Sequence, residues 1–305
     1  MRPLDIAILI LLSILWGGSF FFIEVLVDYW PPLTIVTIRV AIAAVILWMI
    51  LLARRIPIPK TAGAWWALLV VGMLNNALPF TLIVWGQTQI SSGMASILNA
   101  TTPFFTVLVA GAILADERIT RGKLLGVIIG LIGTVVMIGP EILVSGLSSG
   151  GALGQLAVMG AALSYAFAAV WSRRFKAQGI SPMVIATGQT SMAALMLLPL
   201  TLMIDQPLQN AGLYLGADMM VWGAMLGLAI ASTVLAYILY FRLIASAGAT
   251  NAALVTFLIP ISAILLGVFI LGEAFTRPQA IGMALIGLGL LIMDGRLFKR
   301  TRPEQ

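Results

Sequence analysis

Glu117-Arg118-Ile119-Thr120-Arg121 and Glu273-Ala274-Phe275-Thr276-Arg277 are two copies of one pattern, with glutamate first, threonine fourth and arginine fifth. Residues around the two copies match at the same offset, allowing a one-residue gap for the prolines: Gly126 with Gly282, Gly133 with Gly289, Gly139 with Gly295, and Pro103 with Pro260. Farther out, Pro32 and Pro182 each begin an apolar run. The pattern predicts an internal repeat.

The two copies lie within a series of ten apolar runs that fills most of the 305 residues. Each run has roughly 17–25 residues, enough to cross a hydrocarbon core about 30 Å thick. The predicted spans are 4–27, 33–53, 62–85, 93–115, 122–138, 153–171, 183–204, 221–241, 249–271 and 279–293. Strands are not expected, because a membrane barrel alternates polar and apolar residues and these runs do not.

The composition excludes several classes of protein. Hydrophobic residues make up 61% of the chain and charged residues 9%, with a mean hydropathy of +1.10. Soluble domains are about 45–50% apolar and about 25% charged. A soluble enzyme, a disordered chain and a nucleic-acid-binding domain are therefore poor interpretations. The chain has no cysteine and no histidine, so we expect no disulfide, no thiolate or imidazole metal site and no cofactor.

Ten spans and one duplication give two five-helix units. Because five is odd, the second unit enters the membrane upside down relative to the first, and inverted repeats of this kind are common in transporters. The sequence therefore predicts an all-α membrane protein of ten transmembrane helices, built as two inverted five-helix repeats. The expected units are residues 1–140 and 152–305, joined by a periplasmic Ser/Gly-rich linker at 141–151.

The positive charges alternate between the connections, which sets the expected orientation. One set of connections and termini carries most of the cations: Arg2, Arg54, Arg55, Lys60, Arg118, Arg121, Lys123, Arg173, Arg174, Lys176, Arg242, Arg296, Lys299, Arg300 and Arg302. The opposite set has acidic residues and one cation, Arg277. The positive-inside rule then places both termini in the cytoplasm. The net charge of +6 thus reflects topology, and no nucleic-acid partner is expected.

Three local motifs resemble one known family. Trp16-Gly17-Gly18-Ser19-Phe20 is similar to the WG-x-x-F start of EamA-type proteins of the drug/metabolite transporter superfamily. The two Pro…Glu-x-x-Thr patterns, from Pro103 and from Pro260, resemble its repeated signature, as does Arg39. The resemblance implies ten helices around a central cavity and metabolite export. The chain looks like the bacterial aromatic amino-acid exporters of this family, which implies a multi-pass protein of the inner membrane.

Polar and aromatic residues interrupt the apolar runs near their centres. An unpaired amide in hydrocarbon costs several kcal/mol, so such residues should face a cavity or another helix. The candidate substrate pathway consists of Trp16, Ser19, Phe20, Asn76, Pro79, Phe80, Asn99, Thr102, Ser164, Phe167, Trp171, Ser232, Tyr237 and Thr256. Asn76 and Asn99 could bind an amino or carboxylate group, and the aromatic residues could form a wall for flat apolar substrates. The alternative is hydrogen bonding and packing between helices.

Prolines and charges within spans are candidates for gating. Pro103 and Pro260 remove a backbone hydrogen bond, so they are either hinges for alternating access or static kinks. Arg39 lies about 9 Å inside its span at 1.5 Å per residue, and Glu24 lies about one turn from the same outer end. Either Arg39 binds a substrate carboxylate, or it pairs with Glu24 and stabilises the outer vestibule.

These observations favour an exporter of small, amino-acid-like metabolites that works as a monomer in the lipid bilayer. No carboxylate lies near a span midpoint, so facilitated transport is simpler than proton exchange. Proton-coupled efflux of drugs, nucleosides or other metabolites by the same fold is the alternative. An enzyme is not expected, because the sequence shows neither paired carboxylates nor a Ser-Lys arrangement within the spans. The GxxxG spacings at Gly126 and Gly130 and at Gly223 and Gly227 are interpreted as packing within the bundle rather than a dimer face.

Overall fold

The computed structural model describes residues 1–117, 119–138 and 150–294, and all regular structure in these ranges is helical. Arg118, Gly139, Gly295, the linker up to residue 149 and the basic C-terminal residues lie outside the described residues. The first half contains α1 (Pro3–Val27), α2 (Pro32–Ala53), α3 (Ala62–Gly72), η1 (Met73–Ala77), α4 (Leu78–Gln87), α5 (Ser92–Asn99), α6 (Thr102–Ile113) and α7 (Arg121–Ile138). The second half contains α9 (Gly150–Ala177), α10 (Pro182–Ile204), α11 (Ala211–Leu215), α12 (Met219–Leu226), η3 (Gly227–Leu235), α13 (Ala236–Ala247), α14 (Ala249–Ala252), α15 (Val255–Ile270) and α16 (Arg277–Asp294).

Seven helical segments are long and apolar enough to cross a membrane, so the chain is a multi-pass membrane protein. They are Pro3–Val27, Pro32–Ala53, Ala62–Gln87, Ser92–Ile113, Gly151–Ala177, Pro182–Ile204 and Met219–Ala247. Helices α7, α15 and α16 occupy the other three predicted spans, and Val255–Ile270 and Arg277–Met293 are shorter apolar helices. The predicted count of ten spans depends on these three helices.

Four of the predicted spans are not uniform α-helices, and the ninth of them divides between α14, which ends at Ala252, and α15, which begins at Val255. The π-helical segments η1 and η3 interrupt the third and eighth spans, and π-helical turns are frequent at functional sites. The fourth span breaks between Asn99 and Thr102, where α5 ends and α6 begins. Pro103 accounts for this break, because it lacks an amide hydrogen and its ring clashes with the carbonyl four residues earlier. By contrast, Pro260 lies inside α15 without ending it.

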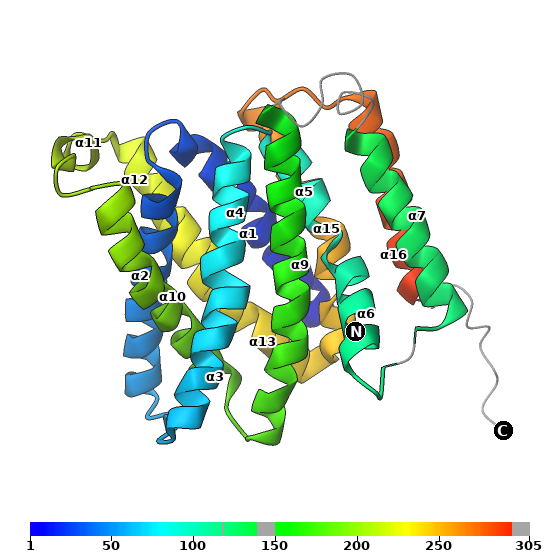
Figure 1. Ribbon diagram of the computed structural model, residues 1–305, viewed down its shortest axis with the longest axis horizontal. Helices are drawn as coiled ribbons and strands as arrows, with labels where there is room; N and C mark the ends of the chain where they lie inside the picture. Colours follow the sequence, from blue (N-terminus) through cyan, green and yellow to red (C-terminus); the bar gives the residue numbers. More distant parts are fainter. Residues whose placement is uncertain (118, 139–149, 295–305) are drawn as a thin grey trace.

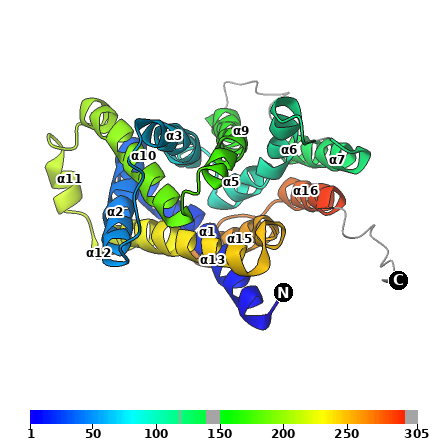
Figure 2. The same cartoon turned by 90° about the horizontal axis from the view of Figure 1, so that it is seen from below.

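Helices α7 and α16 lie side by side at one edge of the bundle in both views (Figure 1 and Figure 2), and each packs mainly against the other. Glycines make this close approach possible. A Cβ on Gly126 would lie 2.5 Å from the carbonyl oxygen of Gly289, and one on Gly133 would lie 2.8 Å from that of Gly282. Each glycine of α7 therefore packs against the sequence counterpart of the other one within one chain, as small residues do in membrane bundles.

The second GxxxG pair behaves differently. Gly227 packs against the ring of Phe22, whereas a Cβ on Gly223 would meet no atom within 4 Å. Only one glycine of this pair therefore makes a close contact.

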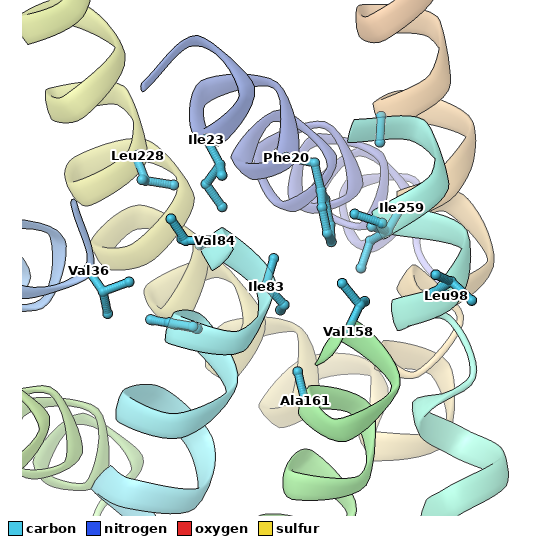
Figure 3. Close-up of a cluster of buried hydrophobic side chains, with 14 of the residues drawn as sticks. Phe20, Ile23, Val36, Ile83, Val84, Leu98, Val158, Ala161, Leu228 and Ile259 are labelled. Atoms are coloured by element: carbon cyan, nitrogen blue, oxygen red, sulfur yellow. The ribbon is translucent and has the colours of Figure 1, made fainter. Parts of the chain in front are cut away.

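The buried core lies where α1, α2, α4, α5, α9, η3 and α15 meet (Figure 3). Phe20 and Ile23 of α1 point toward Ile83 of α4 and Ile259 of α15 in this cluster. All four side chains are less than 10% exposed. Because elements from both halves of the chain contribute to the same core, the two halves form one membrane unit with a shared interior.

The two copies of the Glu-x-x-Thr pattern lie at opposite ends of the bundle. The connection from α6 to α7 is at the bottom of Figure 1, and the connection from α15 to α16 is at the top. The α9–α10 connection lies at the bottom with the first copy. The matching sequences therefore occupy opposite ends of the molecule.

Candidate functional site

A cavity of about 430 Å³ lies inside the bundle, within the range of roughly 300–1,000 Å³ typical of small-molecule sites. The predicted pathway and charge residues that line it are Trp16, Ser19, Phe20, Arg39, Phe80, Asn99, Thr102, Ser232, Tyr237 and Thr256. They come from α1, α2, α4, α5, α6, η3, α13 and α15. The fold thus brings together side chains that are distributed over most of the chain.

Among the residues that the structure describes, Arg39 is the only charged one that lines the cavity. It is 5% exposed, and its Nε donates a hydrogen bond to Oγ1 of Thr233 at 2.9 Å. Its guanidinium carbon lies 3.7 Å from the centroid of the Phe80 ring, a cation–π geometry. The π-helical segment η3 places Thr233 here, and its hydroxyl donates to the carbonyl oxygen of Leu228. Arg39 forms no ion pair within the described residues.

The alternative pairing of Arg39 with Glu24 is wrong. An Oε2 atom of Glu24 accepts a hydrogen bond from Nε2 of Gln87 at 2.9 Å, and the same amide donates to the carbonyl oxygen of Phe20. Gln87, at the end of α4, therefore neighbours the Glu24 carboxylate. Arg39 instead contacts neutral groups of η3 and α4.

The adjacent amides Asn75 and Asn76 in η1 have different environments. Asn76 is fully buried, does not line the cavity, and donates to the hydroxyl of Tyr237 at 3.0 Å. Asn75 lines the cavity and donates to Oε1 of Gln189 at 3.2 Å. Of the two interpretations given for Asn76, the structure therefore shows hydrogen bonding between helices. Its contact holds Tyr237, which lines the cavity.

Two buried polar atoms of the lining have no hydrogen-bond partner among the described residues. They are Oδ1 of Asn99 and Oγ of Ser232. Both residues line the cavity, although the two atoms themselves are buried, and a buried polar atom without a partner costs about 1–3 kcal/mol. The lining also contains aromatic rings. The ring centroids of Trp16 and Tyr240 are 5.1 Å apart, and Tyr237 stacks on Phe241 with centroids 6.2 Å apart.

The remaining predicted residues lie outside the lining. Ser164 donates to the carbonyl oxygen of Leu74, and Trp171 donates to that of Ala67, so both connect α9 to neighbouring helices. Phe167 is 41% exposed. Neither Glu24 nor any of Pro79, Pro103 and Pro260 lines the cavity.

Several lining residues are missing from the sequence-based set. They include Asn75, Tyr165, Gln189, Tyr240 and Phe241. Gln189 carries the same signal as Asn76, an amide in an apolar span. Tyr240 and Phe241 follow Tyr237 by three and four residues, so they share its helix face. Within the described residues, no group of three or more His, Cys, Asp and Glu side chains could hold a metal ion.

Comparisons with known proteins agree with this architecture. The EamA-like transporter family matches residues 4–139 and 152–293. The inner membrane transporter YedA of Escherichia coli K12, described as uncharacterized, is 26% identical over 290 residues, which cover 94% of this chain and 90% of that protein. A probable amino-acid metabolite efflux pump of Salmonella typhimurium is 25% identical over 291 residues, covering 93% and 92%.

Two further similarities extend over nearly the full length. Protein PecM of Dickeya dadantii is 25% identical over 289 residues, covering 94% of this chain and 91% of that protein. A solved crystal structure aligns with a TM-score of 0.65 over 99% of this chain and 100% of the other, at 18% identity. At that identity, the structural match supports the fold alone.

Proposed function

The chain belongs to the EamA-like transporter family, and from this premise we propose that it exports small metabolites across the bacterial inner membrane. The proposed substrates are amino-acid-like compounds with an aromatic or hydrophobic body. The proposed mechanism is alternating access without a coupled ion.

The cavity around Arg39 is the observation that carries the substrate proposal. It combines one guanidinium, two polar atoms without partners and several aromatic rings. A guanidinium binds a carboxylate through paired hydrogen bonds, and the rings suit a flat apolar body. The name of the Salmonella relative, which includes amino-acid metabolite efflux, supports the same class of compound.

The proposed architecture is ten transmembrane helices in two inverted repeats, residues 1–140 and 152–305, with the linker at 141–151 and both termini in the cytoplasm. The matched glycines of α7 and α16 and the opposite placement of the two Glu-x-x-Thr copies support it. The protein is proposed to act as a monomer, because the glycines of α7 and α16 are already packed within one chain.

The proposal of alternating access rests on a difference between the two ends of the bundle. The cavity extends to Ser172 near the end of α9, Ile185 near the beginning of α10 and Phe241 midway along α13. By the positive-inside rule this end is cytoplasmic. At the other end, a part-buried contact of Glu273 joins the α15–α16 connection to α5. We infer a state that is open toward the cytoplasm and closed toward the periplasm.

Facilitated transport is proposed because no carboxylate lines the cavity within the described residues. An antiporter that exchanges protons at its substrate site would need such a group. Proton-coupled efflux of drugs or nucleosides remains the second candidate, and it is favoured only by Glu24, whose carboxylate lies one turn beyond Phe20 on α1.

The proposal is tested by efflux from proteoliposomes loaded with radiolabelled aromatic amino acids and their N-acetylated and deaminated derivatives. We expect wild-type protein to release at least one of these compounds faster than protein-free liposomes. Replacing Arg39→Gln should reduce this efflux about 10- to 100-fold, because hydrogen bonds to charged groups contribute about 1.5–3 kcal/mol.

The matched control is Arg54→Gln, an exposed arginine at the end of the same helix. It should retain wild-type efflux, and both variants should elute as monodisperse protein in detergent. Absence of efflux for every compound would overturn the proposed function. Wild-type efflux by the Arg39→Gln variant would remove Arg39 from substrate binding.

A further inference from the structure

We propose that the cavity selects organic carboxylates with a net charge of −1 and no free ammonium group, such as N-acylated or deaminated aromatic amino acids, over the zwitterionic amino acids. This inference rests on the proposed export function and specifies the substrate class of the same site.

The charge of the lining is the first observation. Arg39 is a buried cation whose partners are the neutral hydroxyl of Thr233 and the neutral ring of Phe80. No Asp, Glu or Lys side chain from the described part of the chain lines the cavity. A buried charge without a counter-charge is unfavourable, so a bound carboxylate supplies the missing negative charge.

Three other carboxylates are hydrogen-bonded elsewhere in the bundle. Glu24 accepts a hydrogen bond from Gln87, and Glu273 accepts two from the backbone of α5. Asp205 accepts from the backbone and hydroxyl of Thr34. None of these three lines the cavity, so none is placed to bind an ammonium group of a ligand there.

The net charge of the occupied cavity then separates three classes of ligand. A monoanion brings Arg39 and its ligand to a total of zero. A zwitterion leaves the site with one positive charge, and its ammonium group lies close to its own carboxylate and hence to the guanidinium, which repels it. A cationic ligand is worse still, because two positive charges would share a site shielded from water.

The neutral polar residues of the lining suit the rest of such a ligand. Asn75, Asn99, Gln189 and Ser232 line the cavity and carry no charge. Amide and hydroxyl side chains can hydrogen-bond to an amide N–H or an indole N–H without adding charge. The rings of Trp16 and Tyr240 offer a surface for the aromatic body.

The substrate charge also supplies a driving force. A bacterial membrane is negative inside, so outward movement of a monoanion is downhill by a factor of about 50 in concentration for each 100 mV. Export of this class then needs no coupling ion, which agrees with a lining that lacks a proton-binding carboxylate.

The test uses three compounds with one indole ring and different charges: N-acetyl-L-tryptophan (−1), L-tryptophan (0) and L-tryptophanamide (+1). Efflux from wild-type proteoliposomes is measured at zero potential and with an inside-negative potential set by potassium and valinomycin. Protein-free liposomes correct for passive leakage. We expect N-acetyl-L-tryptophan to leave at least about tenfold faster than the other two, and only its efflux to accelerate with the potential.

Arginine variants separate charge from shape. Arg39→Lys keeps a cation and should keep the preference for the anion. Arg39→Gln should abolish that preference, and Arg54→Gln should behave as wild type. The wild-type ranking decides the question even if an Arg39 variant fails to fold.

Two results would overturn the inference in different ways. Equal or faster efflux of L-tryptophan, without dependence on potential, would refute the charge selection and leave the export function intact. No protein-dependent efflux of any compound, here or in the wider amino-acid panel, would refute the export function itself.

Discussion

Glu273 and Glu117 begin the same five-residue pattern at opposite ends of the bundle (Figure 1), yet their carboxylates have different surroundings. The Glu273 carboxylate accepts hydrogen bonds from the backbone N–H groups of Ser92 at 2.8 Å and Gly93 at 3.1 Å. The side chain of Glu117 is 41% exposed and lies 3.5 Å from Lys123 and 4.0 Å from Arg173.

The threonines of the two patterns, by contrast, act alike. Oγ1 of Thr120 accepts a hydrogen bond from the amide of Lys123 at the start of α7. Oγ1 of Thr276 accepts from the amide of Gln279 at the start of α16, and the Gln279 side chain accepts from the amide of Thr276. These are N-terminal caps of the following helix, the second with a full capping box. The local role of the pattern is therefore the same in both copies.

The difference between the glutamates concerns contacts with distant parts of the chain. Glu273 places a negative charge at the N-terminus of α5, where backbone amides and the helix dipole stabilise it. Gly267 leaves room for it, because a Cβ there would lie 2.5 Å from Oε2 of Glu273. The side chains of the ion pairs near Glu117 are 34–66% exposed, so these pairs are screened by salt. One end of the bundle is thus held by part-buried hydrogen bonds to backbone N–H groups and the other by exposed ion pairs.

Removing each carboxylate in turn is the strongest test of whether the two glutamates contribute differently to stability. We expect Glu273→Ala to lower stability by about 1.5–3 kcal/mol, the range for hydrogen bonds to charged groups. Glu117→Ala should lower it by at most about 0.5 kcal/mol, as for exposed ion pairs. Thermal melting of the purified protein in detergent checks this, since the larger loss gives the lower melting temperature. Equal shifts of the melting temperature would show that the two glutamates contribute equally to stability.

The smallest expected effect concerns the Asp116–Arg173 ion pair at the Glu117 end of the bundle. Arg173 donates to both carboxylate oxygens of Asp116 at 3.2 and 2.8 Å, and these hydrogen bonds hold the pKa of Asp116 below its ordinary value. A lowered pKa means that the stabilisation is present at neutral pH and is lost as pH falls through the folded-state pKa. Asp116→Asn should therefore lower the melting temperature slightly at pH 7 and by less as the pH falls below the ordinary aspartate pKa.

Salt provides the control for that variant. At about 1 M salt the Debye length is only about 3 Å, so the small effect of Asp116→Asn at pH 7 should disappear while the effect of Glu273→Ala persists. An Asp116→Asn effect that is unchanged by acid and by salt would contradict the exposed-pair description.

Much of this molecule could be predicted from its sequence, because the lengths of the apolar runs and the internal repeat can be read directly from the residues. The helical class, the transporter family and many cavity residues were accessible in this way. A polar side chain in an apolar span must face something polar, and that reasoning led to Asn99 and Ser232, which line the cavity.

Which polar neighbour faces the cavity could not be predicted. Asn75 and Asn76 are adjacent, and the π-helical segment η1 alters the rotation per residue on which a helical-face argument depends. The partners of Arg39 are equally nonlocal, because Thr233 lies 194 residues away in η3. The sequence also does not show that Glu273 reaches α5 while Glu117 stays among surface cations.

The measurement that tests alternating access around this cavity most directly is the sidedness of thiol labelling. The chain has no cysteine, so Thr256→Cys places a single thiol in the lining. With a membrane-impermeant reagent, we predict faster labelling from the cytoplasmic side than from the periplasmic side. Adding Glu273→Ala should increase periplasmic labelling severalfold. Equal labelling from both sides, unchanged by Glu273→Ala, would contradict a cavity that the Glu273 end closes.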